Sequence, residues 1–210
     1  MKKVVDAAHG LRERKKARTR EALIDAALEL FERKGFEATT IEDIAAAAEV
    51  SPRTFFRYFE SKPELIMARS ASKESRIGPM LAARPAGEGL LEATREVVRA
   101  ELDDHLADPL VVRELQVMLT TPSLRKLARE HFHEEEAELV VAVAGRLGVS
   151  PDDLEAQVTA TMIASAIWTT TNRWVAQGAD PKRLEPMLDE AFAILADGLA
   201  SGTQSRRPAR

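Results

Sequence analysis

Side chains that suit contact with DNA gather in a short segment of the chain, residues 52–59. Within it, Arg53 can hydrogen-bond O6 and N7 of one guanine in the major groove, and Thr54 can meet a thymine methyl group or a phosphate. Phe55 and Phe59 are four residues apart, so on a helix they share a second face that can pack against apolar neighbours. Recognition of the major groove requires a helix with one dry face and one polar, cationic face. The segment therefore predicts a recognition helix.

Residues around this segment are expected to hold the helix on the sugar–phosphate backbone. Tyr58 and Lys62 offer a phenol and an ammonium group to phosphates, which fix the register without reading sequence. A helix that starts at Thr40 would add its free N–H groups, because these attract anions. The residues predicted to contact DNA are Arg18, Arg20, Thr40, Ser51, Pro52, Arg53, Thr54, Arg57, Tyr58 and Lys62. Each alone is more often an ordinary core or surface residue, and it is their joint spacing that favours DNA binding.

Start and stop signals place this segment inside a helix-turn-helix. Residues 19–34 carry apolar side chains three and four positions apart and are followed by Gly35, which predicts a helix that ends there. Thr40, with an aspartate three residues later, forms a capping box for a second helix. Ser51 caps the third helix, and Ser61 caps a fourth. Two helices joined by a turn of three or four residues form a helix-turn-helix.

The rest of the chain also follows the spacing of helices. Tyr, Phe and Trp are scarce, and apolar residues recur every three or four positions. We therefore predict an all-α fold of about nine helices. Pro and Gly residues, singly or close together, separate five helices beyond the helix-turn-helix. Their expected spans are 88–106, 109–119, 123–147, 151–177 and 181–200.

Charge is distributed unevenly along the chain. The formal net charge is −4, yet residues 1–20 hold eight Lys or Arg against two acidic residues, a net of +6. A cationic end on an acidic body suits contact with nucleic acid at that end, because the attraction to phosphate falls off within a Debye length of ~8–10 Å. A solvated, disordered tail is an equally good interpretation of residues 2–14 taken alone.

The sequence has neither cysteine nor a long apolar run. Without cysteine it has no disulfides, thiolate metal sites or cysteine nucleophiles, which suits a reducing compartment. No apolar run approaches the ~20 residues that a membrane span needs, and the first residues do not form a signal peptide. We therefore expect a soluble, unprocessed, cytoplasmic protein with no membrane partner.

Three short patterns occur between Thr19 and Leu65: a Phe-x-x-x-Gly-Phe-x-x-Thr-Thr junction, an Ile-Ala pair in the second helix, and Thr-Phe-Phe-x-Tyr-Phe-x-Ser-Lys. Through these patterns the stretch closely resembles the DNA-binding domain of the TetR family of bacterial regulators. The resemblance implies three DNA-binding helices, a connecting fourth helix, and an all-helical domain that binds an effector and forms a dimer. The expected divisions are a basic N-terminal arm at 1–18, a helix-turn-helix domain at 19–65, an effector-binding and dimerisation domain at 66–200, and a disordered tail at 201–210.

Two positions depart from the pattern of the family. Phe56 stands where many relatives carry a tyrosine whose hydroxyl meets a phosphate, so that contact is expected to be absent. Glu49 replaces the glycine that is common in the turn. Either this turn does not strictly require a positive φ, or Glu49 adopts one at a small cost.

The last two helices are expected to form a homodimer. The resemblance implies that they pair with their symmetry mates as a four-helix bundle. Residues 151–177 are unusually apolar, which fits a dimer seam and equally fits a helix buried within a monomer. Such a dimer would present two recognition helices to a double-stranded, palindromic DNA operator. A small-molecule effector of unknown identity would release the repressor by binding the form whose helices are wrongly spaced for DNA. Candidates for its pocket, each more often core or surface, are Met67, Leu102, His105, Leu115, Met118, Leu119, Phe132, Trp168, Thr171 and Asn172.

Other functions are weaker interpretations of the sequence. His131 and His133 lie beside a run of glutamates, but residues two apart on a helix point to nearly opposite sides, so no metal site and no cofactor are expected. The sequence contains no glycine-rich phosphate loop or nucleophile elbow that would indicate an enzyme. A DNA-binding architectural protein without a ligand and an activator instead of a repressor are the alternatives.

Overall fold

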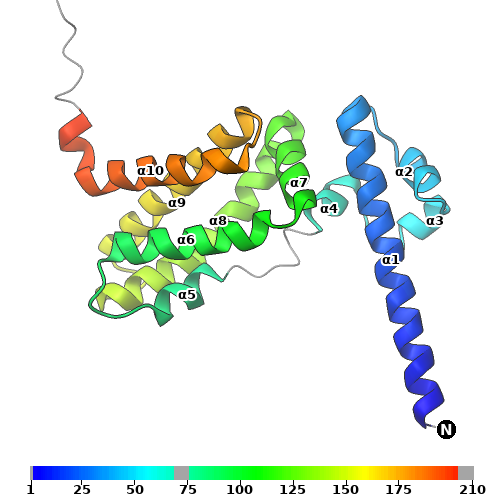
Figure 1. Ribbon diagram of the computed structural model, residues 1–210, viewed down its shortest axis with the longest axis horizontal. Helices are drawn as coiled ribbons and strands as arrows, with labels where there is room; N and C mark the ends of the chain where they lie inside the picture. The colour runs from blue at the N-terminus through cyan, green and yellow to red at the C-terminus, as the bar shows by residue number, and fades with distance from the viewer. Residues whose placement is uncertain (1, 69–75, 203–210) are drawn as a thin grey trace, which may run out of the picture. The chain divides into compact units, whose positions relative to one another are not determined.

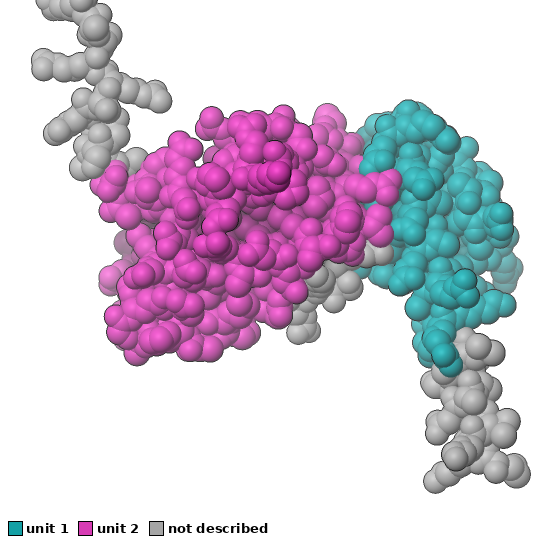
Figure 2. Space-filling view, viewed as in Figure 1, with its two compact units in different colours: residues 1–73 teal, residues 74–210 magenta. Residues whose placement is uncertain are grey.

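The protein is described by a computed structural model of the chain, and its ordered elements are all helical. Every regular element within the described residues is an α-helix, which confirms the all-α prediction. None of these helices is both long and apolar enough to cross a membrane. The chain divides into two compact units, residues 1–73 and residues 74–210 (Figure 2). The structure describes residues 2–68 and 76–202, and all side chains among them except those of 2–12, 105, 135 and 199–202.

The first unit differs from the sequence prediction in the length of its first helix. We expected a separate arm before a helix near Thr19, whereas α1 runs without a break from Lys2 (Figure 1). Residues 11–20 are nearly all strong helix formers (Leu, Arg, Lys, Glu and Ala), which lets the helix extend. It ends as predicted at Gly35, whose φ of +86° suits glycine. The described helices of this unit are α1 (Lys2–Lys34), α2 (Ile41–Ala47), α3 (Pro52–Phe55) and α4 (Lys62–Met67).

Apolar faces of these four helices and the loop residue Phe59 form the core of the first unit. α1 packs against α2 and α4, and α2 packs against α3. Burying side chains of this size contributes ~1.5–3 kcal/mol each and fixes the short helices, which are too short to be stable alone. The large buried side chains of this unit are Leu23, Ile24, Leu28, Leu30, Phe31, Phe36, Ile44, Phe55, Phe59, Leu65 and Ile66.

The second unit contains one described helix that the sequence does not predict. Gly78 and Pro79 indicate a break, yet both lie in the first turn of a helix, where the missing N–H of proline has no intrahelical partner to lose. At the other end, the last helix continues to Gly202 across a kink at Gly198. Residues 203–210, most of the predicted disordered tail, lie outside the described residues. The helices are α5 (Ile77–Ala83), α6 (Leu90–Leu106), α7 (Pro109–Thr120), α8 (Pro122–Leu147), α9 (Leu154–Ala176) and α10 (Pro181–Gly202).

α9 packs against three neighbours in the second unit, α7, α8 and α10. Small residues on its buried face, among them Ala156, Ala160 and Ala164, let these helices approach closely. At its end, the buried Trp174 donates a hydrogen bond from Nε1 to the backbone oxygen of Asp180, at 2.7 Å. This bond fixes the turn that leads into α10.

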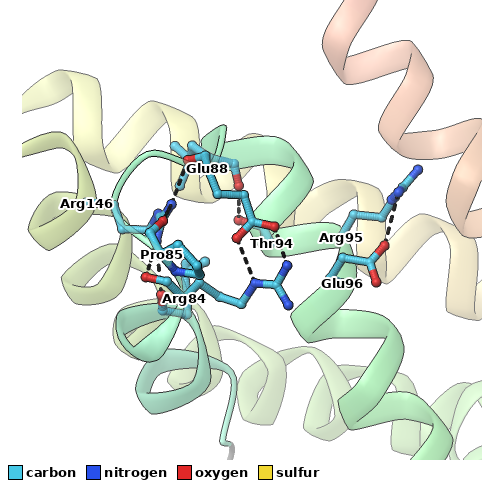
Figure 3. A network of polar contacts seen from close by, with 9 residues as sticks. Arg84, Pro85, Glu88, Thr94, Arg95, Glu96 and Arg146 are labelled. Carbon is cyan, nitrogen blue, oxygen red and sulfur yellow. Dashed lines mark hydrogen bonds and ion pairs between the residues drawn. The ribbon is translucent and has the colours of Figure 1, made fainter.

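Arg146, near the end of α8, binds the loop between α5 and α6 through hydrogen bonds (Figure 3). Its guanidinium donates hydrogen bonds to four backbone oxygens, those of Leu81, Arg84, Pro85 and Glu88, at 2.7–3.4 Å. Within the loop, Arg84 also pairs with the Glu88 carboxylate and lowers its pKa. A single cation on α8 therefore joins the end of α5 and the loop after it to the end of α8.

Candidate nucleic-acid interface

Ser51 and Pro52 begin α3 as the sequence predicts. Ser51 Oγ accepts a hydrogen bond from the backbone N–H three residues later, at 3.2 Å, and Pro52 occupies the first helical position. In the turn before them, Glu49 has a φ of +55°, so the turn does require a left-handed residue and Glu49 adopts that conformation. α3 itself is shorter than predicted. It ends at Phe55, and residues 56–58 continue as hydrogen-bonded turns.

Phe55 and Phe59 form the dry face of this segment, as predicted. Their side chains are 0% and 2% exposed, and their ring centroids lie 5.8 Å apart. The guanidinium of Arg20, from α1, lies over the Phe59 ring at 5.4 Å. These contacts hold α3 against the unit and leave its other side to solvent.

The other side of α3 presents the predicted polar side chains. Pro52, Arg53 and Arg57 are exposed, and Thr54 and Tyr58 are half-buried. Arg57 lies 5.0 Å over the ring of Tyr58 and donates a hydrogen bond to its hydroxyl at 3.3 Å, which orients both side chains. Arg53 has no hydrogen-bond or ion-pair partner among the described residues. Its five N–H donors are therefore available to a bound molecule.

A complete capping box starts α2, as the sequence predicts. Thr40 Oγ1 accepts from the backbone N–H of Asp43 at 3.1 Å, and Asp43 Oδ2 accepts from the backbone N–H of Thr40 at 2.9 Å. Lys34, at the end of α1, pairs with the same carboxylate. The hydrogen bonds from Lys34 and Thr40 hold the pKa of Asp43 well below its usual value. Thr40 and Arg18 are exposed, and their contacts with phosphates stay predictions.

Arg20 and Lys62 make contacts inside the unit that we did not expect from the sequence. Arg20 donates to the backbone oxygen of Ala68 at 2.9 Å, just past the end of α4. Lys62 Nζ donates to the backbone oxygens of Phe36 and Thr39 at 2.7 and 2.6 Å, and lies 4.5 Å over the Phe36 ring. The only local signal for these contacts is that basic residues commonly bind carbonyl groups near the ends of helices. The phosphate contacts predicted for both residues stay predictions.

The predicted effector residues lie in both units. Met67 is on α4 in the first unit, and the others are on α6 to α9 in the second. Met118 and Leu119 are buried on α7, and the side chain of His105 lies outside the described residues. The remaining six are half-buried: Leu102, Leu115, Phe132, Trp168, Thr171 and Asn172.

Two of these residues, Phe132 of α8 and Trp168 of α9, are brought together by the fold. Their ring centroids lie 5.0 Å apart, and the Arg129 guanidinium lies 5.4 Å over the Trp168 ring. Asn172 donates to the backbone oxygen of Trp168 at 2.8 Å. Glu114, a fully buried acidic residue on α7, was not predicted from the sequence, although Val111 and Met118, three and four positions away, lie on the same buried face of the helix.

The two neighbouring histidines of α8 pair with different carboxylates. His131 lies 3.6 Å from Glu134, and His133 lies 2.9 Å from Glu136. Glu136 also accepts a hydrogen bond from Thr161 at 2.6 Å, which is the main cause of its lowered pKa. Across the part of the chain that the structure describes, no group of three His, Asp or Glu side chains is placed to hold a metal ion.

α3 follows the capped helix α2, packs its apolar side against the unit and exposes an arginine on its other side. This arrangement defines a DNA-binding protein of the helix-turn-helix class. Two family models match the chain: "Bacterial regulatory proteins, tetR family" over residues 23–68 and "MftR C-terminal domain" over residues 88–200. The chain is 39% identical over 151 residues to the HTH-type transcriptional regulator TcmR of Streptomyces glaucescens, covering 69% of this chain and 67% of that one. The chain belongs to the TetR family and is a DNA-binding transcriptional regulator.

Solved structures show the same fold. The repressor NalD of Pseudomonas aeruginosa superposes with a TM-score of 0.63 at 20% identity, covering 84% of this chain and 96% of that one. FadR of Thermus thermophilus, a TetR-family repressor solved in complex with lauroyl-CoA, superposes with a TM-score of 0.55 at 25% identity. That match covers 86% of this chain and 94% of FadR. TcmR and NalD are named as a transcriptional regulator and a repressor.

Proposed function

We propose that this chain is a cytoplasmic repressor that binds a palindromic operator as a homodimer and leaves it when a small molecule binds. The observation that carries the proposal is the exposed Arg53 on a helix whose opposite face is dry. A guanidinium in that position can donate to O6 and N7 of one guanine, a contact that contributes ~1–3 kcal/mol of base discrimination. Arg57 and Tyr58, already oriented by each other, would bind phosphates on either side.

The dimer would form through α9 and α10. Leu154, Val158 and Met162 follow one another at intervals of one turn on α9, and the last two are 47% and 45% exposed. Between residues 156 and 172, α9 carries no charged residue, so its exposed side there is entirely uncharged. Depletion of charge is typical of the core of a protein interface. α10, which packs against α9, adds Ile194 with 60% exposure.

Two-fold symmetry of this dimer accounts for the expected operator. Both copies would present the same α3 to DNA, so the two half-sites must be inverted repeats of one sequence. Their spacing must match the distance between the two recognition helices. A ligand that binds the wrongly spaced form more tightly would lower the affinity of the dimer for DNA. The ratio of the ligand's affinities for the two forms limits how large this decrease can be.

The second unit is the proposed site of the effector. The lauroyl-CoA complex of FadR supports a small-molecule ligand for a relative with the same fold. In this chain, the half-buried Phe132 and Trp168 offer apolar surface, and the hydroxyl of Thr171 and the amide of Asn172 lie within one turn of Trp168. We propose that these four residues contribute to the effector site.

The test is selection of bound sequences from random duplex DNA by the purified chain, followed by titration of the selected site at two salt concentrations. We expect an inverted repeat bound strongly in preference to random DNA, with one dimer per site by light scattering. Selection is repeated with small-molecule extracts present, because some regulators bind DNA only with ligand. If neither condition enriches a site, the repressor proposal is wrong.

A further inference from the structure

Phe56 is an exposed aromatic residue on the side of the protein proposed to face DNA. Its side chain is 55% exposed, and it is the one exposed large hydrophobic residue among the described side chains of the first unit. Its backbone dihedrals are helical, so it lies on the same face as Pro52 and Arg53, which precede it by four and three residues. An apolar ring therefore stands beside the arginine that is proposed to read a base.

The ring of Phe56 has one packing contact before any partner binds. It meets the Phe55 ring edge to face, with centroids 5.5 Å apart and planes at 82°. Phe55 is fully buried, so this support is rigid. The backbone N–H of Phe56 also donates to the Pro52 oxygen at 3.1 Å. This contact restricts the ring and so reduces the conformational entropy that it loses when it meets a ligand.

The chemistry of a phenyl ring limits what it can recognise on DNA. It has no hydroxyl to donate to a phosphate, whereas the major groove offers one apolar group, the C5-methyl of thymine. We propose that Phe56 is a specificity-determining residue that packs on a thymine methyl group in each half-site. The inference rests on the proposed function, since it requires α3 to lie in the major groove.

The geometry also limits where that thymine lies. Phe56 lies three positions after Arg53, which corresponds to a rise of about 4.5 Å along the helix axis. Base pairs are stacked about 3.4 Å apart. The methyl group should therefore lie within about two base pairs of the guanine that Arg53 reads.

The test uses the selected operator and removes one methyl group at a time by replacing thymine with deoxyuridine in both half-sites. Burial of one methyl group corresponds to about fourfold in affinity for a half-site and about fifteenfold for the dimer. We expect this loss for the wild-type protein at one symmetric position. F56A should bind the thymine site about as weakly as the wild type binds the deoxyuridine site, and should no longer respond to the methyl group. F56L, which keeps an apolar side chain, should keep part of the preference.

Two controls separate the possible outcomes. V141A removes apolar surface from a 60% exposed residue of α8 and should leave the methyl preference unchanged. If the wild type binds a selected site but no deoxyuridine position weakens it, or if F56A keeps the full preference, the assignment of Phe56 is wrong while the proposed function stands. If no site is selected, both fail.

Discussion

Replacing Lys62 with methionine tests whether the ammonium group of this residue stabilises the fold or binds a phosphate of DNA. The substitution keeps the apolar stem and removes an ammonium group that lies 2.6–2.7 Å from two backbone oxygens and 4.5 Å from the Phe36 ring. Hydrogen bonds to charged groups contribute ~1.5–3 kcal/mol each, and an exposed cation–π contact adds ~0.5–1 kcal/mol. Lys62 is half-buried, so solvent screening reduces the sum, and we expect K62M to lose about 2 kcal/mol of unfolding free energy.

Thermal unfolding and salt titration together measure this effect. In a chain of this size, a loss of about 2 kcal/mol lowers Tm by about 4–8 °C. If Lys62 only joins the start of α4 to the loop before α2, the salt dependence of operator binding stays as in the wild type. Loss of a phosphate contact in each subunit would instead reduce the slope of log Kd against log salt by about 1.8 for the dimer.

K182M is the matched control, because Lys182 is an exposed lysine at the start of α10 and its loss changes the net charge by the same amount. It should change neither Tm nor the salt slope. An unchanged Tm for K62M together with a flatter salt slope would refute the structural role, and would show that the ammonium group leaves the carbonyls to bind phosphate.

Three further predictions test the interface, the dimer and the capping box. R53A should weaken binding to the selected operator by ~1–3 kcal/mol per half-site and relax the preference at one base pair, whereas an equal loss on scrambled DNA would make Arg53 a phosphate contact. V158E places a charge on the proposed seam of α9 and should yield monomers in light scattering, whereas V141E, at a comparably exposed residue of α8, should remain dimeric. Asp43 has a lowered pKa in the folded protein, so it stabilises the fold above its ordinary pKa of 3.8, and this contribution is lost as the pH falls through the folded pKa. The difference in unfolding free energy between wild type and D43N should therefore shrink below pH 3.8, and a constant difference in chemical denaturation would contradict the role of the box.

The elements that position the interface are predictable because local chemistry marks their ends. Thr40 and Ser51 cap helices through hydrogen bonds to N–H groups three residues away, and Gly35 takes the positive φ that ends α1. The dry face of Phe55 and Phe59 follows from their spacing alone. Each of these features depends on residues within one or two turns, which a sequence displays directly.

Contacts between distant segments of the chain cannot be recognised from neighbouring residues in the sequence. Lys62 binds carbonyls that lie 23 and 26 residues earlier in the chain, and Arg20 binds one that lies 48 residues later. A basic residue beside a recognition helix therefore has two possible partners, the protein's own carbonyls or the phosphates of DNA. Only the three-dimensional path of the chain distinguishes them. α5 escapes prediction for a local reason instead, because a proline in the first turn of a helix does not break it and Pro79 lies in that turn.

The proposed effector site is hardest to predict for a different physical reason. Periodicity identifies which side of a helix faces inward, but a ligand site forms where the inward side chains of several helices fail to fill the space between them. Phe132 and Trp168 meet at 5.0 Å although they belong to different helices, and Met118 and Leu119 are buried by their own neighbours. All four carry the same apolar signal in the sequence. The half-buried pair can exchange its remaining contact with water for contact with a ligand, whereas the buried pair must first move, so ligand contacts should be sought first at Phe132 and Trp168.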